Sequence, residues 1–151
     1  MPDLALSVAT DPDHRFDLAV QLGQFDVALD IARHGPASGA EMRWRTIGDQ
    51  ALAHWDVALA QECFKHANDV HSLFLVATAQ QDKALLSHVA EAARAKGELN
   101  LAVAALVQLQ DTRGVVDVLM QAQRLPEAAL FARTYAPHLV PVSYTHLTLP
   151  T

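Results

Sequence analysis

Cysteine and histidine residues near the middle of the chain have the spacing of a possible metal site. Cys63 and His66 lie three residues apart, and His71 follows five residues later. Such pairs can bind Zn²⁺, but a structural zinc site takes about four ligands and no fourth one is apparent. Cys63 also falls within an apolar stripe, where a free thiol acts as a small hydrophobic group. We therefore expect Cys63 to be a structural residue, and we predict no metal ligands and no cofactor.

Serines, histidines and carboxylates are present, but their arrangement is not catalytic. A nucleophile needs a base beside it and a third group that orients this base. The adjacent pairs His71-Ser72 and Ser87-His88 would point about 100° apart on a helix and match no nucleophile motif. Aspartates at helix starts or exposed turns are explained by capping: Asp11, Asp13, Asp49, Asp82 and Asp111. We predict no catalytic residues and a chain that is not an enzyme.

Charge and glycine content argue against nucleic acid and lipid as direct partners. The net charge is −6, and only three of the eleven basic residues are lysines. Binding to phosphates needs clustered cations or a glycine-rich loop followed by lysine, whereas Gly35 and Gly39 are isolated. The longest apolar run, residues 101–107, is far shorter than the roughly 20 residues that span a bilayer. We expect no nucleic-acid binding and no direct membrane insertion. Four arginines are candidates for contact with acidic groups of a protein partner, although a solvated arginine on a helix is the more common case: Arg43, Arg45, Arg124 and Arg133.

The elements that carry these residues are predicted to be helices paired in hairpins. Leu125, Ala128, Ala129 and Ala132 fall at helical spacing on one face. Residues 115–122 form an equivalent stripe, so residues 123–124 are interpreted as a tight turn between antiparallel helices. Because each hairpin buries its stripe only against its neighbours, the pattern predicts an all-α fold. We expect an α-solenoid of helical hairpins, a TPR-like alpha-alpha superhelix of about nine helices.

Residues at the corners and stripes of these hairpins are predicted to hold the helices together. Trp44 and Trp55 are eleven residues apart, the spacing of a single buried helix face, so we expect core positions rather than a ligand platform. Corners at 25, 55, 99 and 125 are 30, 44 and 26 residues apart, too uneven for a strict tetratricopeptide repeat of about 34 residues. The pattern assigns no partner interface. The predicted packing residues are Phe25, Ala28, Trp44, Trp55, Ala58, Leu99, Ala102, Leu125, Ala128 and Ala132.

Capping signals predict several helix ends. Asp11 and Pro12 are a good N-cap and first helical residue, and Asp82 is a second N-cap. Gly23 and Gly97 can take the left-handed conformation that ends helices. Residues 34–40 contain two glycines and a proline and are interpreted as a loop inside the array.

Residues 1–140 and 141–151 are interpreted differently. Helical patterning fills residues 1–140, which we assign to the solenoid. Residues 141–151 lose this pattern and are predicted to be a non-helical tail. The final SYTHLTLPT (143–151) resembles a translated cloning adapter and is excluded from fold reasoning, with a genuine disordered tail as the alternative.

Several strings together resemble the helical solenoid of the coatomer beta-prime subunit family, over about residues 4–138. They are TDPDHRFDLAVQLG (10–23), WR (44–45), AQECF (60–64), AARAKGELN (92–100) and RLPEAALFARTY (124–135). The resemblance implies a structural subunit of the COPI coat, which shapes vesicles for retrograde Golgi-to-ER and intra-Golgi traffic. It also implies other coatomer subunits, especially the alpha subunit, as partners. The implied location is cytoplasmic, peripheral on Golgi membranes and COPI-coated vesicles.

The resemblance is partial, and two alternatives stay open. Members of this family carry WD-repeat propellers that recognise dilysine cargo signals, and no segment here resembles a propeller blade, so we interpret the chain as a fragment. A TPR-like peptide-binding adaptor is the first alternative, although its carboxylate clamp would be poorly supplied by lysines at 65, 83 and 96 alone. The second is a solenoid of another transport complex, which would lack the string at residues 124–135.

Overall fold

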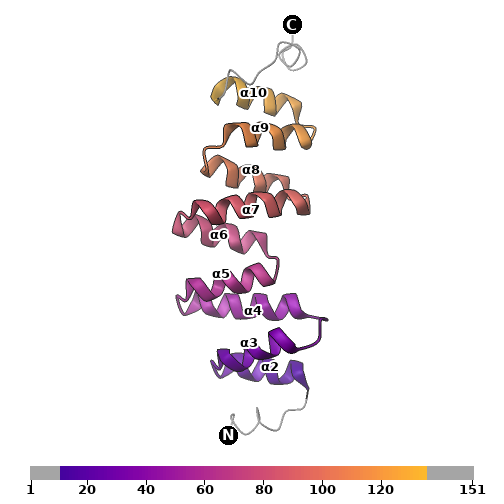
Figure 1. Ribbon diagram of the computed structural model, residues 1–151, viewed down its shortest axis with the longest axis vertical. Coiled ribbons are helices and arrows are strands. Elements are labelled where there is room, and N and C mark those ends of the chain that lie inside the picture. The colour runs from indigo at the N-terminus through magenta and orange to yellow at the C-terminus, as the bar shows by residue number, and fades with distance from the viewer. Residues whose placement is uncertain (1–10, 136–151) are drawn as a thin grey trace. The chain divides into compact units, whose positions relative to one another are not determined.

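The computed structural model describes residues 11–135, and this part of the chain is all-α (Figure 1). It contains nine helices and no strand, which confirms the predicted fold class for the described residues. The predicted tail at 141–151 lies outside them. The helices are α2 (Pro12–Gln21), α3 (Phe25–His34), α4 (Ala40–Ala53), α5 (Val57–His66), α6 (Val70–Gln80), α7 (Lys83–Lys96), α8 (Leu99–Gln108), α9 (Thr112–Gln121) and α10 (Leu125–Tyr135).

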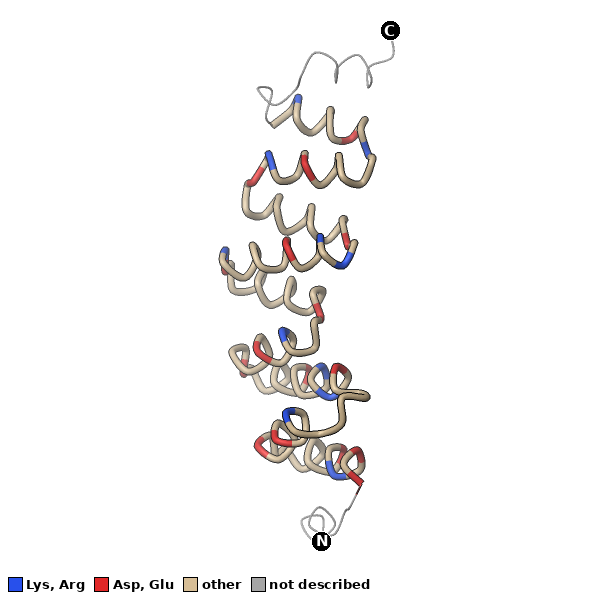
Figure 2. The backbone as a smooth tube through the Cα atoms, turned by 45° about the vertical axis from the view of Figure 1, so that its right-hand side comes forward, with Lys and Arg blue, Asp and Glu red and all other residues tan. Residues whose placement is uncertain are grey.

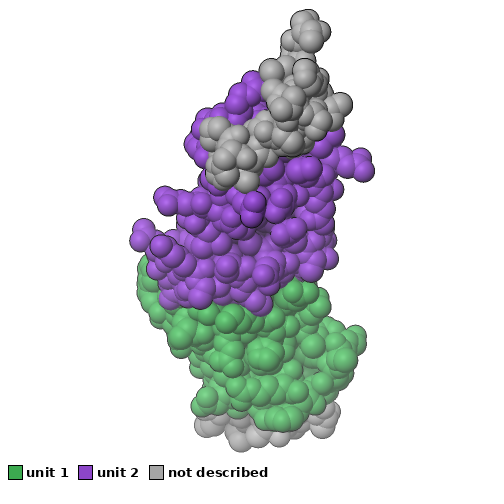
Figure 3. All heavy atoms as spheres, turned by 45° about the horizontal axis from the view of Figure 1, so that its top comes forward, with its two compact units in different colours: residues 1–72 green, residues 73–151 purple. Residues whose placement is uncertain are grey.

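The chain divides into two compact units, residues 1–72 and 73–151 (Figure 3). In unit 1, α3 packs on α2 and α4, and α4 packs on α5. In unit 2, α7 packs on α8, α8 on α9 and α9 on α10. Helices α6 and α8 carry no Lys, Arg, Asp or Glu, and their backbones are uniformly tan in Figure 2. Within each unit, these helices pack mainly on their neighbours in the sequence, as in arrays of helical hairpins.

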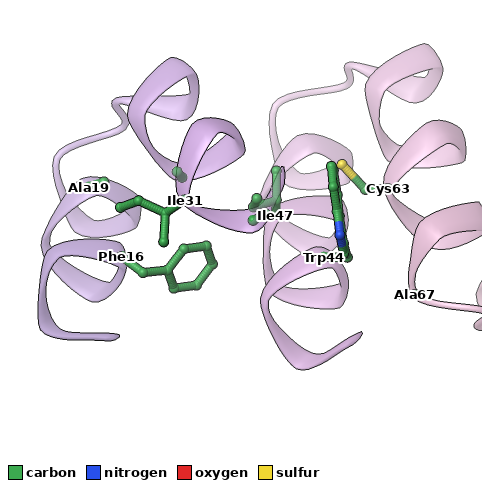
Figure 4. Packing of buried hydrophobic residues seen from close by; sticks show 9 residues of the cluster. Phe16, Ala19, Ile31, Trp44, Ile47, Cys63 and Ala67 are labelled. Carbon is green, nitrogen blue, oxygen red and sulfur yellow. The ribbon is translucent and has the colours of Figure 1, made fainter. Parts of the chain in front are cut away.

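The core of unit 1 is built from one apolar stripe on each helix (Figure 4). Small residues on the stripes let the helix axes approach, and larger side chains fill the space between them. The buried cluster consists of Phe16 and Ala19 on α2, Ala28, Ile31 and Ala32 on α3, Trp44 and Ile47 on α4, and Cys63 and Ala67 at α5.

Seven of the eight connections between the described helices use the same backbone turn. The residue that follows the last helical turn adopts a left-handed conformation, with φ between 52° and 78°. The next N–H then donates to the carbonyl five residues earlier, as from Asp56 to Ala51 at 2.8 Å and from Glu98 to Ala93 at 2.8 Å. This is the Schellman motif, which satisfies a carbonyl left open at a helix end. The left-handed residues are Gly23, Trp55, Asn68, Gln81, Gly97, Gln110 and Gln123.

Each of these turns also starts the next helix, because the residue after the left-handed one is the N-cap. In four turns this N-cap is an aspartate, and its carboxylate accepts an N–H from the first turn of the new helix. The distances are 3.2 Å at Asp56, 3.2 Å at Asp69, 3.1 Å at Asp82 and 2.9 Å at Asp111. The left-handed positions 55, 68 and 81 are 13 residues apart, as are 97, 110 and 123.

The connection between α3 and α4 is the exception, and a buried arginine holds it in place. Arg43 Nη2 donates to the carbonyl oxygens of Pro36 and Ser38, the latter at 2.8 Å. Arg43 Nη1 lies 3.5 Å from Asp13 Oδ1, and the residue is only 4% exposed. The expected loop is therefore present, but Arg43 is a structural residue and not the exposed partner contact that the sequence suggested.

Two of the predicted packing residues are exposed, and these predictions are wrong. Helix α4 ends at Ala53, so Trp55 lies in the left-handed turn instead of continuing the helical face of Trp44, and it is 87% exposed. Ala58 is exposed because the buried stripe of α5 runs through Ala60. A separation of two residues turns Ala58 by about 200°, to the opposite face of the helix.

The other eight packing residues lie inside their units. Five are buried: Ala28, Trp44, Ala102, Ala128 and Ala132. Three are partly buried: Phe25, Leu99 and Leu125. Trp55 is a left-handed residue, whereas Phe25, Leu99 and Leu125 each begin a helix. At like positions, the left-handed residues 23, 55, 97 and 123, these corners are 32, 42 and 26 residues apart, so their spacing remains uneven.

Gln80 and Gln81 give a direct test of the turn, because they are neighbours of one residue type with different backbones. Gln81 has φ 54°, whereas Gln80 is the last residue of α6. Gln81→Gly should stabilise the chain by about 1 kcal/mol because glycine avoids the left-handed penalty. Gln80→Gly should destabilise it by about 0.5 kcal/mol because glycine weakens a helix. Urea denaturation followed by circular dichroism measures both, and equal signs would contradict the role assigned to the turn.

Gly48 lets α4 and α5 approach closely, and we predict that alanine is destabilising there. A β-carbon at position 48 would lie 2.6 Å from Cε1 of Phe64, whose ring is fully buried. Alanine favours the helix by about 1 kcal/mol, but overpacking costs about 1–3 kcal/mol. Gly48→Ala should therefore lower the free energy of unfolding by about 1 kcal/mol. In a Phe64→Leu background the loss should shrink, and an unchanged loss would exclude this contact as its cause.

Candidate packing and docking surfaces

Cys63, which was expected to be structural rather than a metal ligand, lies in the core of unit 1, whereas His66 is exposed and covers Trp44. Burial, helped by the nearby Glu62 carboxylate, raises the pKa of the Cys63 thiol to about 11, so the thiol is protonated at neutral pH. A protonated thiol is a poor nucleophile and a poor metal ligand. The His66 ring stacks on Trp44, with centroids 4.3 Å apart and planes 18° apart. Within residues 11–135, no group of three His, Cys, Asp or Glu side chains is placed to hold a metal ion.

The predicted capping aspartates are at helix starts with one exception. Asp11, Asp82 and Asp111 accept N–H groups at the starts of α2, α7 and α9, and Asp13 lies in the first turn of α2. Asp49 lies within α4, so its assignment as a cap or turn residue is wrong.

Asp69 and Arg45 form an ion pair inside unit 1. Asp69 is buried, and its Oδ2 lies 3.0 Å from Arg45 Nε and accepts a hydrogen bond from the Ser72 hydroxyl at 2.7 Å. Burial alone would raise the pKa of Asp69, but the hydrogen bonds from Ser72 and the Arg45 charge outweigh it and lower the pKa. The carboxylate is therefore held charged by the fold. Arg45, a candidate partner contact, is engaged within its own unit.

The most developed surface feature of unit 2 is an apolar groove on α8, α9 and α10. We call it the C-terminal groove. It consists of two hollows of about 550 and 370 Å³ that share four lining residues, Val107, Val115, Phe131 and Tyr135. Leu130 also lines the larger hollow and is 64% exposed. Exposed apolar side chains gathered in a groove are typical of a protein-binding surface.

The polar residues beside the C-terminal groove are paired with one another. Arg124 Nη1 donates to Asn100 Oδ1 at 2.7 Å, and Arg124 Nη2 forms an ion pair with Glu127. Arg124, another candidate partner contact, therefore braces α8 against α10. Because its charge is compensated within the unit, the larger hollow is suited to an apolar helix face rather than to an acidic peptide.

Sequence reasoning located the inner face of α10 but missed its outer face. Ala128, Ala129 and Ala132 are buried against α9, as their spacing predicted. Leu130 and Tyr135 lie outside this stripe and carry the groove. Large apolar residues that fall off an otherwise complete stripe were the available signal.

None of the helices in the described part of the chain is long and apolar enough to cross a membrane.

Comparison with known proteins identifies the family of this helical array. A profile described as the COPA/B TPR domain matches residues 1–146. Coatomer subunit beta' of Drosophila melanogaster is 41% identical over 133 residues, which are 88% of this chain and 14% of that protein. The Rattus norvegicus protein is 38% identical over 136 residues, 90% of this chain and 15% of its own length. Coatomer subunit beta'-1 of Arabidopsis thaliana is 38% identical over 140 residues, which are 93% of this chain and 15% of that protein.

These matches agree with the packed helical hairpins described above and confirm the resemblance inferred from the residue strings. The chain spans about 15% of the length of these curated relatives. Because the family profile covers nearly all of the chain, this protein belongs to the COPA/B TPR domain family and is a homologue of coatomer subunit beta'.

Proposed function

We propose that this chain is a scaffold segment of the COPI vesicle coat, acting in Golgi-to-ER and intra-Golgi transport, and not an enzyme. The observation that carries the proposal is the match of the COPA/B TPR domain family to residues 1–146. Its relatives are named as coatomer subunits. The chain would act in the cytoplasm and be peripheral on Golgi membranes and coated vesicles through its partners. Cargo recognition is assigned to no residue of this chain.

Packing with another coat subunit, in particular the alpha subunit, is the mechanism we propose. The C-terminal groove supports it, because the groove offers apolar side chains from three helices and the charged residues of its larger hollow, Arg124 and Glu127, are already paired. Burying a Leu or Phe side chain that was exposed stabilises a contact by about 1.5–3 kcal/mol. Leu130, Phe131 and Tyr135 together would then supply much of the affinity of a helix-in-groove contact.

A TPR-like peptide-binding adaptor is the alternative function. Such an adaptor holds the carboxylate of an extended peptide with several cations in one groove. Of the residues lining the larger hollow, Arg124 is the only Lys or Arg, and it is paired with Glu127. This arrangement favours the packing role. A solenoid of another transport complex is disfavoured because the matching family model and the relatives reported above are those of coatomer subunits.

A charge placed in the C-terminal groove tests the packing role. Leu130 on α10 and Met42 on α4 are both 64% exposed, so either can be replaced without disturbing a core. Leu130→Asp should weaken binding of the 151-residue chain to purified coatomer alpha subunit at least about tenfold, because burying an unpaired carboxylate is costly. Met42→Asp, the matched control in unit 1, should bind normally. Affinity is measured by isothermal titration calorimetry, with thermal melts to verify folding.

Two results would contradict the proposal. One is undiminished binding by a folded Leu130→Asp variant, which would remove the C-terminal groove from the interface. The other is capture of peptides ending in a free carboxylate with no binding to any coatomer subunit, which would favour the adaptor.

A further inference from the structure

Trp55 combines two features that the fold itself does not require. Its backbone is left-handed, with φ 60°, a conformation that strains a bulky residue. The equivalent positions at Gly23 and Gly97 are glycine, and the remaining ones are Asn or Gln. The indole is also 87% exposed and makes none of the aromatic ring contacts found among the described residues. Strained residues retained on a surface are frequently functional.

Trp55 lies beside a second corner of unit 1. The ring of His54, the preceding residue, meets the ring of Phe25 edge-on with centroids 5.7 Å apart. The α2–α3 and α4–α5 turns are therefore neighbours. A shallow hollow of about 360 Å³ is lined by residues 23–27 at the first of them. We call residues 23–27 and 54–56 together the Trp55 edge.

Charge is distributed unevenly between the two ends of the helices in unit 1. Asp26, in the first turn of α3, and Asp56, the N-cap of α5, lie at the Trp55 edge. No Lys or Arg lies there. All five described basic residues of unit 1 lie in the helix halves at the opposite end: Arg15, Arg33, Arg43, Arg45 and Lys65. The Trp55 edge is therefore aromatic and acidic, without a compensating Lys or Arg of its own.

Aromatic and acidic groups together recognise a guanidinium. Its planar, weakly hydrated cation stacks on an indole face, and carboxylates accept its N–H groups. Asp56 is held in place because its Oδ1 accepts the Leu59 N–H at 3.2 Å. A lysine ammonium is smaller and more strongly hydrated, so it gains less from stacking.

We propose that the Trp55 edge docks an arginine-bearing segment of a partner protein, with the guanidinium stacked on the Trp55 indole and its charge compensated by Asp26 and Asp56. This surface belongs to unit 1 and is separate from the C-terminal groove. The inference does not depend on the COPI assignment, and it goes beyond that assignment because it names the side chain that is recognised.

Trp55→Gly separates docking from folding. Glycine suits the left-handed turn, as at Gly23, so this variant should melt at the same temperature as the parent chain or higher. Its affinity for the acetylated and amidated peptide Gly-Arg-Gly-Arg-Gly-Arg-Gly should fall at least about threefold, because the stacking is lost. Calorimetry on the 151-residue chain measures this affinity. Equal affinity of parent and Trp55→Gly would overturn the proposal.

The two tryptophans of the chain provide an internal control. In a nitrogen–proton NMR titration with the same peptide, the indole signal of Trp55 should shift and that of the buried Trp44 should not. Shifts confined to Trp44, or no shift at all, would contradict docking at the Trp55 edge.

Charge variants test the acidic half of the site. Asp56→Asn keeps a good N-cap while removing the charge, so it should weaken peptide binding without unfolding α5. Asp117→Asn, which removes an exposed charge from α9 in unit 2, should leave affinity unchanged. A version of the peptide with lysine in place of arginine should bind more weakly. Equal binding of the lysine peptide, or equal losses in the two aspartate variants, would show non-specific attraction and overturn the proposal.

Discussion

A single backbone hydrogen bond, present at seven of the eight connections between the described helices, is the constraint on which this structure depends. It joins the N–H of an N-cap to a carbonyl five residues earlier, so the end of one helix and the start of the next form one unit. Leaving a buried carbonyl unpaired costs about 1–3 kcal/mol, and losing an aspartate cap costs about 1 kcal/mol. The left-handed residue costs about 1–2 kcal/mol when it is not glycine. The hydrogen bond and the cap together outweigh the cost of the left-handed backbone, so five non-glycine residues can occupy this position.

Features read from local chemistry were predicted well from the sequence. Asp82 and Gly97 were predicted to start and end one helix, and they are the N-cap and C-cap of α7. The stripe on α10 was also located correctly, because alanines at helical spacing leave little choice of inner face. About nine helices were predicted, and the described residues contain nine. Such features depend on residues close in sequence, where the chemistry of capping and the period of the helix are sufficient.

Trp55 and the C-terminal groove could not be predicted in the same way. Helical periodicity places Trp55 on the face of Trp44, and nothing in its residue type reveals that the backbone turns left-handed two residues after α4 ends. Glycine after a helix predicts a left-handed turn, whereas Trp and Gln do not. The groove depends on which residues of α8, α9 and α10 come together, as the buried Val115 and the exposed Val107 and Leu130 do. Large apolar residues off the α10 stripe signal an outer apolar face on that helix, but which residues of α8 and α9 meet it is set by packing between the helices.

The left-handed corner position has a consequence for how proteins of this kind diversify. The turn is held by main-chain atoms, so its side chain projects outward and contributes little to the hydrogen bond that defines the corner. Gly, Trp, Asn and Gln all occur there in this one chain. A single mutation can thus replace the side chain at a corner while the helices keep their packing. Selection can therefore change what one edge of the protein binds without changing its fold.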